Sequence, residues 1–265
     1  MGAPVALSIA GSDSSAGAGV QADLKTFAAL GVYGASVITA LTAQNTKGVL
    51  AIHEVPADFI ATQMDAVFSD LEVGATKIGM LANMATTEAV GAGLDRHRAR
   101  NVVLDPVLLS SSGEALLRPD AIDGLRRLIG RTRVLTPNLG EAAALLNAPL
   151  ARDEAAMHAQ AERLLALGAE AVLIKGGHLD GPESVDFLVD SDGCERFAAP
   201  RIAAKNTHGT GCTLSAAVVA GLVQGLSLSE AVREAKTYVT AAIAAAARLD
   251  IGSGHGPLHH FHKWW

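Results

Sequence analysis

Short apolar segments alternate with longer amphipathic segments along this chain. The short segments are rich in Val, Ile and Leu and are too brief for buried helices, so they predict strands. The predicted strands are Val5–Ala10, Val32–Ala40, Thr76–Leu81, Asn101–Asp105, Arg133–Thr136 and Ala171–Lys175. The amphipathic segments predict helices at Val20–Leu30, Ala57–Leu71, Thr86–Arg98, Pro119–Ile129, Leu139–Leu146, Glu154–Leu167, Gly211–Gly225 and Leu228–Leu249.

This alternation predicts an α/β fold with a central, mainly parallel sheet and helices on both faces. Asp186–Asp190 and Glu195–Ala199 are joined by Ser191, Asp192 and Gly193, which predicts a hairpin and hence a small antiparallel edge. No linker, repeat or low-complexity tract interrupts the pattern. We therefore expect residues 1–265 to form a single domain.

Composition narrows the class of protein. The chain has 265 residues, of which 49% are hydrophobic and 18% charged, so it can bury a large core. Its net charge of −6 argues against a nucleic-acid partner. It has neither an apolar run of the ~20 residues that cross a bilayer nor a secretion signal, so we expect a cytoplasmic protein with no membrane partner. The spacing of Cys194 and Cys212 suggests neither a disulfide framework nor a zinc site.

The turn Gly209-Thr210-Gly211 precedes a predicted helix and indicates an anion site. Glycines let backbone N–H groups converge on one point, and the positive end of the helix dipole faces the same point. Cys212 follows directly, and we expect the dipole to lower its pKa and make it a base or nucleophile. The alternative is a glycine-rich turn with a buried structural cysteine.

Polar residues follow several of the predicted strands. In an open α/β sheet these positions face one crevice, where ligands bind. They are Gly11-Ser12-Asp13, Gln44-Asn45-Thr46, Gly79-Met80, Asp105-Pro106, Asn138 and Lys175-Gly176-Gly177. Asp105 and Glu141 are candidates to hold Mg²⁺, which uses few protein oxygens, although Glu141 would also suit a helix first turn. Lys175 and Lys236 are candidates to neutralise phosphates, and for Lys236 a solvated helix face is an equal alternative.

Other catalytic motifs receive little support. Gly17-x-Gly19-x-x-Ala22 formally matches a dinucleotide-binding fingerprint, but the second strand ends in Ala43-Gln44-Asn45 without the required acid. The chain has no P-loop, no His-Glu-x-x-His and no Gly-x-Ser-x-Gly motif. Its tail, residues 252–265, is rich in His and ends in Trp264-Trp265, and we expect these aromatic residues to pack over the core rather than to bind a metal.

Taken together, these segments resemble the hydroxymethylpyrimidine/phosphomethylpyrimidine kinases of thiamine biosynthesis, within the ribokinase superfamily. The resemblance depends on segments in order along the whole chain, each weak alone. They are Ile9–Gly19, Thr42–Thr46, Lys77–Leu81, Asp105-Pro106-Val107, Thr136-Pro137-Asn138 with Glu141, Lys175–His178, Asn206–Thr213 and the tail from Gly256 to Trp265. One departure is Ser110-Ser111-Ser112 before Gly113, where many members have a Lys, so the lid contacts of that loop stay open.

The resemblance implies a ribokinase-like fold and a kinase that uses ATP and Mg²⁺. Its substrate would be 4-amino-5-hydroxymethyl-2-methylpyrimidine, phosphorylated first at the hydroxymethyl oxygen and then to the diphosphate. Cys212 would accept the hydroxyl proton, while the backbone N–H groups of Gly209, Thr210, Gly211 and Cys212 hold the phosphoryl group. The family also suggests a homodimer.

The resemblance further assigns the binding residues. The pyrimidine would contact Gln44 through its amino edge, Met80 and Val107 through its ring, and Gly11 and Asp23 in the same pocket. ATP would contact Lys175, Asn138, Thr207, His208 and Lys236, and Asp105 with Glu141 would support Mg²⁺. Pyridoxal kinase is the nearest alternative, because pyridoxal also carries a hydroxymethyl group on an aza-aromatic ring. A nicotinamide-dependent dehydrogenase and a non-catalytic binding protein are alternatives of other classes.

Overall fold

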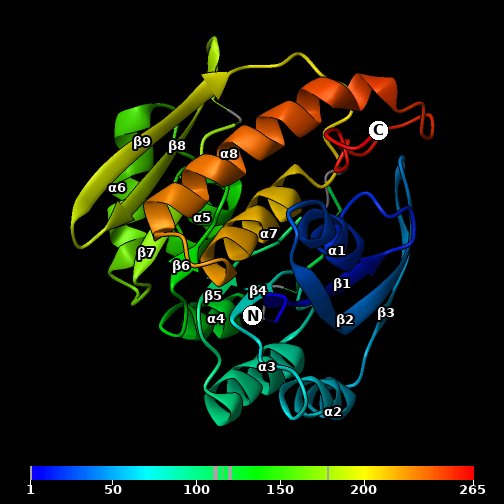
Figure 1. The fold of residues 1–265 in the computed structure, drawn as a ribbon. Coiled ribbons are helices and arrows are strands. Elements are labelled where there is room, and N and C mark those ends of the chain that lie inside the picture. The colour runs from blue at the N-terminus through cyan, green and yellow to red at the C-terminus, as the bar shows by residue number, and fades with distance from the viewer. Residues whose placement is uncertain (1, 110–112, 115, 119–120, 178) are drawn as a thin grey trace.

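The computed structural model describes residues 2–265 except 110–112, 115, 119–120 and 178. Within them nine strands form one sheet in the order β3-β2-β1-β4-β5-β6-β7-β8-β9 (Figure 1). The strands are β1 Val5–Asp13, β2 Tyr33–Asn45, β3 Gly48–Glu54, β4 Ala75–Ile78, β5 Val102–Leu104, β6 Val134–Leu135, β7 Ala171–Lys175, β8 Glu183–Asp190 and β9 Gly193–Pro200. Neighbouring strands from β2 to β7 are parallel, whereas β3, β8 and β9 pair antiparallel. The predicted α/β class is confirmed.

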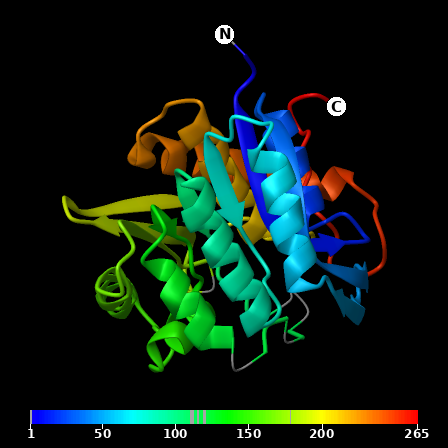
Figure 2. The same ribbon diagram turned by 90° about the horizontal axis from the view of Figure 1, so that it is seen from below.

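Helices cover both faces of the sheet (Figures 1 and 2). One face carries α1 Gly19–Ala29, α7 Thr210–Val223 and α8 Leu228–Ala245, which leads into a short 3₁₀ turn at Ala246–Arg248. The other carries α2 Ala57–Phe68, α3 Met84–His97, α4 Ala121–Ile129, α5 Leu139–Leu146 and α6 Glu154–Leu165. No helix in the described part of the chain is long and apolar enough to cross a membrane.

Strand alternation explains the two cores. Successive side chains of a strand point to opposite faces. In β1, Leu7 and Ile9 join the cluster under α2–α6, whereas Ala6 joins the cluster under α1, α7 and α8. In β7, Val172 belongs to the first cluster and Leu173 to the second. The central strands are therefore apolar on both faces, as the short Val, Leu and Ile runs predicted.

The structure differs from the prediction mainly at the β2–β3 edge. β2 continues past Ala40 to Asn45, and β3 pairs with this extension although no strand was predicted there. β3 is mostly exposed, with Leu50 78% and Ile52 38% exposed, so it lacks the half-buried alternation that identifies a strand. The extension matters because it places Gln44 at the end of β2. The predicted start of a helix at Pro119 and the loop at Ser110–Ser112 lie outside the described residues.

Candidate active site

A cleft of about 1020 Å³ opens along the carboxyl ends of the parallel strands, where this architecture binds its ligands. Its lining contains every predicted site residue except Asp23. These residues are Gly11, Gln44, Met80, Asp105, Val107, Asn138, Glu141, Lys175, Thr207, His208, Gly209, Thr210, Gly211, Cys212 and Lys236. The two ends of the cleft differ in chemistry: one is polar and partly apolar, and the other is charged.

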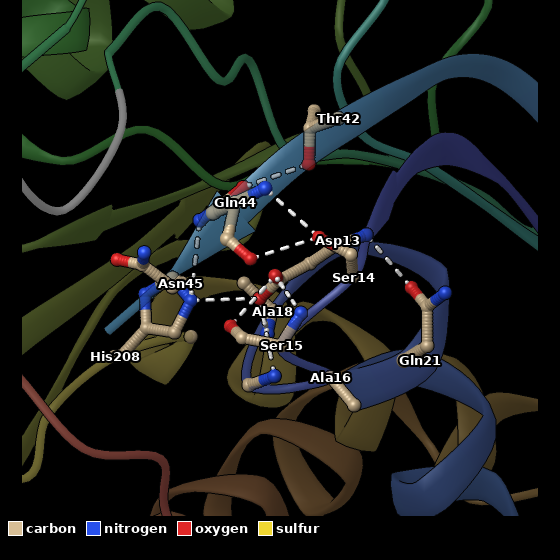
Figure 3. A network of polar contacts seen from close by, with 12 residues as sticks. Asp13, Ser14, Ser15, Ala16, Ala18, Gln21, Thr42, Gln44, Asn45 and His208 are labelled. Atoms are coloured by element: carbon tan, nitrogen blue, oxygen red, sulfur yellow. Dashed lines mark hydrogen bonds and ion pairs between the residues drawn. The ribbon is translucent and has the colours of Figure 1, made fainter. Parts of the chain in front are cut away.

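Asp13, at the end of β1, organises the polar end of the cleft (Figure 3). Its Oδ1 accepts hydrogen bonds from the backbone N–H and hydroxyl of Ser15, at 2.8 and 2.7 Å. Its Oδ2 accepts from the Ala18 N–H at 2.8 Å and lies 2.8 Å from Nε2 of His208. Burial alone would raise the pKa of Asp13, but these hydrogen bonds, led by that of His208, lower it to about 2. Asp13 is therefore ionised and holds the loop that leads into α1.

Gln44 projects beside the same His208 ring (Figure 3). Its amide nitrogen lies 3.3 Å from His208 Nε2, and its amide oxygen lies 3.1 Å from Thr42 Oγ1. These contacts place His208 next to the residue predicted to read the pyrimidine, which differs from the ATP-binding role predicted for His208. Apolar groups adjoin this end, because Met80 packs with Ala40 and Val107. Amide and apolar groups together suit a flat, uncharged heteroaromatic ring.

The glycine turn begins α7 as predicted. Gly209 is the N-cap residue with φ +82°, a conformation that favours glycine, and a Cβ there would collide with the carbonyl of Gly17. The Thr210 N–H already donates to Thr207 O at 3.2 Å, so Thr210 is a poorer backbone donor than the sequence suggested. The N–H groups that open a helix have no acceptor within it, so Gly211 and Cys212 present an anion-binding N-terminus to the cleft.

The pKa expected for Cys212 is wrong in direction. Burial raises the pKa of its thiol to about 11, above the usual 9.0. The charge of Lys77 opposes this increase, whereas the charges of Asp23 and Asp105 add to it. Desolvation therefore outweighs the helix N-terminus that was expected to lower the pKa, and the resting thiol is neutral.

Asp23 lies beneath the cleft rather than in it. It is fully buried, its Oδ2 accepts from Ser8 Oγ at 2.6 Å, and it pairs with Lys77 at 2.8 Å. Burial is the largest single influence on the pKa of Lys77 and would lower it, but the charges around the amine, led by that of Asp23 and joined by that of Asp105, together outweigh burial and keep the amine charged. The predicted contact between Asp23 and the substrate is therefore wrong, and it is Lys77 that reaches the cleft lining.

Lys175, Asp105 and Glu141 form the charged end of the cleft. Lys175 Nζ lies 2.8 Å from Asp105 Oδ1 and 3.9 Å from Glu141 Oε2, and a Cβ on Gly211 would lie 3.2 Å from the same amine. Ser215 Oγ donates to Asp105 Oδ2 at 3.2 Å. Burial raises the pKa of Glu141 to about 7, although Lys175 opposes the increase. This end therefore places a cation and two carboxylates beside the helix N-terminus.

The structure gives Glu141 and Lys236 contacts that the sequence left open. Glu141 and Asn138 form a reciprocal capping box at the start of α5, so the helix-cap reading of Glu141 holds alongside its place in the cleft. Lys236 Nζ lies 2.6 Å from Asp186 Oδ2 and 3.2 Å from Ser184 Oγ. Lys236 is therefore no solvated lysine but a paired one at the cleft wall.

The tail supports the site from outside. His208 N–H donates to Gly256 O at 3.1 Å, so the tail runs against the loop before α7. The predicted packing of both tryptophans over the core is wrong, since Trp264 and Trp265 are 69% and 70% exposed. His260 of the same tail is buried, and its ring lies 3.0 Å from Thr213 Oγ1.

Asp13, Thr42 and Lys77 are the residues that sequence reasoning left without a role. Asp13 is a hydrogen-bond hub and Lys77 is a fully buried cation. The sequence carries a signal for Lys77, because a lysine inside the apolar segment Ala75–Ile78 needs a buried partner. Asp13 was expected only to face the crevice and Thr42 was not marked at all, because their partners His208 and Ser12 come from other elements.

Comparison with known proteins matches this chain to a family of kinases. The phosphomethylpyrimidine kinase family model matches residues 13–259. A hydroxymethylpyrimidine/phosphomethylpyrimidine kinase of Rhizobium meliloti is 58% identical over 98% of both chains, and one of Salmonella typhimurium is 58% identical over the same shares. A thiamine biosynthesis bifunctional protein of Geobacter sulfurreducens is 51% identical over 96% of this chain and 51% of its own.

Solved structures agree on the fold. The ADP complex of Bacillus subtilis pyridoxal kinase aligns with a TM-score of 0.91 and 36% identity over 98% of both chains. A phosphomethylpyrimidine kinase from Clostridium difficile aligns with a TM-score of 0.80 and 42% identity, over 90% of this chain and 99% of its own.

Fold and cleft together define a small-molecule kinase with a ribokinase-like fold, which confirms the predicted enzyme class and excludes the dehydrogenase alternative. The chain belongs to the phosphomethylpyrimidine kinase family. It is a kinase of the hydroxymethylpyrimidine/phosphomethylpyrimidine type.

Proposed function

We propose that this kinase phosphorylates 4-amino-5-hydroxymethyl-2-methylpyrimidine at its hydroxymethyl oxygen and then converts the monophosphate to the diphosphate, in thiamine biosynthesis. The observation that carries the proposal is that one cleft holds the Gln44 amide and the Cys212 turn together with Lys175, Asp105 and Glu141. A ring held by Gln44, Met80 and Val107 would point its hydroxymethyl group toward the helix N-terminus. Gly11 fits the wall of this pocket because it has no side chain, since a Cβ there would lie only 3.0 Å from Met80 Sδ.

Electrostatic stabilisation would supply most of the catalysis. Phosphoryl transfer depends on alignment and on neutralising charge more than on covalent chemistry. The N–H groups of Gly209, Gly211 and Cys212 would hold the migrating phosphoryl group, and Lys175 and Lys77 would lower its negative charge. Asn138, Thr207 and Lys236 would contact ATP, with Lys236 shared between Asp186 and the nucleotide.

Cys212 would accept the proton of the substrate hydroxyl. With a pKa of about 11, little of it is thiolate at neutral pH, but the thiolate that exists is a strong base next to the charge of Lys77. The proton would leave the hydroxymethyl oxygen as its bond to phosphorus forms, so a base is needed late rather than early.

Asp105 and Glu141 fit a magnesium ion that is held mainly by ATP. The described residues contain no group of three or more His, Cys, Asp or Glu side chains that would cage a metal, and Mg²⁺ commonly needs only one or two carboxylates besides phosphates and water. Bound there, the ion would neutralise the β- and γ-phosphate oxygens. A single domain, a homodimer and a cytoplasmic location complete the proposal and stay predictions.

Steady-state turnover of ATP with the aminopyrimidine and, separately, with pyridoxal tests this function. We expect kcat/KM to favour the aminopyrimidine at least tenfold, followed by a second phosphorylation of its monophosphate. Pyridoxal is the relevant competitor because the Bacillus subtilis pyridoxal kinase shares this fold. A preference for pyridoxal would contradict the proposed substrate, and sedimentation of the purified enzyme would test the dimer.

A further inference from the structure

Asp13 determines where the hydrogen on His208 Nε2 points. Its Nε2 lies 2.8 Å from Asp13 Oδ2 (Figure 3). An ionised carboxylate only accepts hydrogen bonds, so Nε2 must carry a hydrogen and donate it, whether the ring is neutral or charged. The Gln44 amide lies 3.3 Å from the same Nε2. A protonated Nε2 has no lone pair for an amide N–H, whereas an amide oxygen can share the Nε2–H with Asp13 as a second, more distant acceptor.

The hydroxyl of Thr42 donates its hydrogen to Ser12 rather than to Gln44. Thr42 Oγ1 lies 2.8 Å from Ser12 O, a carbonyl that only accepts, so the single hydroxyl hydrogen is donated to Ser12. The other end of the Gln44 amide lies 3.1 Å from Thr42 Oγ1. Only lone pairs of Oγ1 remain in that direction, and a lone pair needs an amide N–H. Two independent neighbours therefore favour the same orientation of the amide.

We propose that His208 and Thr42 are positioning residues that fix the Gln44 amide with its oxygen toward His208 and its nitrogen toward Thr42. This orientation is a half-turn about the last side-chain bond from the one drawn in Figure 3. The two ends of an amide are assigned by the partners they meet, and the half-turn is permitted because that torsion is broad and roughly two-fold. Asp13 takes part through His208.

The fixed amide presents different hydrogen-bonding groups to the two sides of a bound ring. With one site of each end already used, the amide offers an acceptor on the His208 side and a donor on the Thr42 side. His208 directly precedes Gly209, so the acceptor lies on the side of the phosphoryl-binding turn. A ring bound here must present a donor close to its hydroxymethyl group and an acceptor one position further on.

This order separates the two candidate substrates, an inference that rests on the proposed function. In the aminopyrimidine, the carbon next to the one bearing the hydroxymethyl group carries an amino donor, and the next ring atom is a nitrogen acceptor. In pyridoxal, the first of these positions carries an aldehyde, which only accepts, and the second carries a phenol, which is ionised at neutral pH and then also accepts. The aldehyde therefore meets the amide oxygen acceptor against acceptor, so a fixed amide selects the aminopyrimidine, whereas a freely turning amide would discriminate less.

The orientation is measurable without turnover. In the ¹⁵N-labelled full-length enzyme, the Gln44 side-chain NH₂ signals are assigned by their loss in Gln44→Glu. We expect nuclear Overhauser contacts from these hydrogens to the Thr42 methyl group. Contacts to the His208 ring hydrogens instead would overturn the proposal. Because no substrate is involved, this result stands apart from any failure of the proposed function.

The selectivity is tested with Thr42→Val and its matched control Thr42→Ser. Valine keeps the shape but cannot accept from the amide, and one such hydrogen bond is worth about 1 kcal/mol, or roughly fivefold. We expect the ratio of kcat/KM for the aminopyrimidine to that for pyridoxal to fall about fivefold in Thr42→Val and to change less than twofold in Thr42→Ser. If pyridoxal is not turned over, its inhibition constant against the aminopyrimidine gives the ratio. Equal losses for both rings would mean that Thr42 is only structural and would overturn the proposal.

Discussion

The two ends of the cleft use polar groups in different ways. At the polar end, the proposed ring-reading end, Gln44, Thr42 and His208 offer directional hydrogen bonds around an ionised Asp13. At the charged end, the proposed phosphoryl end, buried charges face a helix N-terminus. Hydrogen bonds discriminate between ring edges because the wrong edge leaves a buried group unpaired, whereas charges stabilise a developing anion wherever it is held nearby. Substitutions at the first end should therefore change substrate choice, and those at the second should change rate.

The largest effect is expected for Lys175→Met. Loss of this cation should lower kcat about 10³-fold, and leaving Asp105 buried without its partner should destabilise the fold by about 3 kcal/mol. Steady-state kinetics and urea unfolding measure the two effects. The double variant Lys175→Met/Asp105→Asn is the control, which should recover most of the stability but none of the rate. Recovery of rate together with stability would show that Lys175 is only structural.

The next effect is expected for Cys212→Ala, with a fall in kcat of about 10² if the thiolate is the base. Because the thiol pKa is raised to about 11, the thiolate fraction increases tenfold for each unit by which the pH rises toward that value. Wild-type kcat should therefore increase from pH 7 to 9. Cys212→Asp is the control, since a carboxylate starts from a much lower pKa and should stay ionised from pH 7 to 9 even though burial raises that pKa, so its profile should be flat. An unchanged rate in Cys212→Ala would remove the base role without changing the fold.

Gln44→Glu addresses the ring-reading end. A carboxylate keeps the acceptor but loses the donor for the ring nitrogen, so KM for the aminopyrimidine should increase about 30-fold while kcat changes less than threefold. Gln224→Glu, at the far end of α7, is the matched control and should leave both constants unchanged. A large fall in kcat with constant KM would contradict the division of the cleft into two ends.

The smallest effect is a gain in stability for Glu141→Gln. The pKa of Glu141 is raised to about 7 in the folded protein against 4.5 unfolded, so the folded chain holds a proton that the unfolded chain releases. Ionisation of Glu141 therefore costs stability as pH rises from 4.5 through 7. Glutamine avoids the cost, and we expect about 1–2 kcal/mol more stability at pH 8 and no difference below pH 4.5.

Urea unfolding at both pH values measures this gain, with Glu162→Gln on an exposed part of α6 as the control that should show none. Lower activity in the more stable Glu141→Gln would show that the phosphoryl end keeps its charges at the expense of stability. If Glu141→Gln differed from the wild type by the same amount at both pH values, the raised pKa of Glu141 would be contradicted.

The elements were predictable to different degrees for physical reasons. Central strands such as β1 and β7 were found because both of their faces are buried, so their sequences are continuously apolar. Helix α5 was predicted to the residue, since Asn138 and Glu141 mark its start with a capping box. β3 was missed because it is exposed and held by backbone pairing with β2, which needs no particular side chains.

The α/β architecture, the glycine turn at Gly209 and the set of polar residues that meet at one edge of the sheet could all be inferred from the sequence. The hydrophobic period, the glycines and the order of the predicted elements can be recognised without knowing any tertiary contact. What depends on burial and on distant partners became visible only in the packed molecule. Packing raised the pKa of Cys212, withdrew Asp23 to a pair with Lys77, and set His208 between Asp13 and Gln44. Desolvation and hydrogen-bond direction are properties of the packed molecule, because they depend on neighbours that lie far away along the chain.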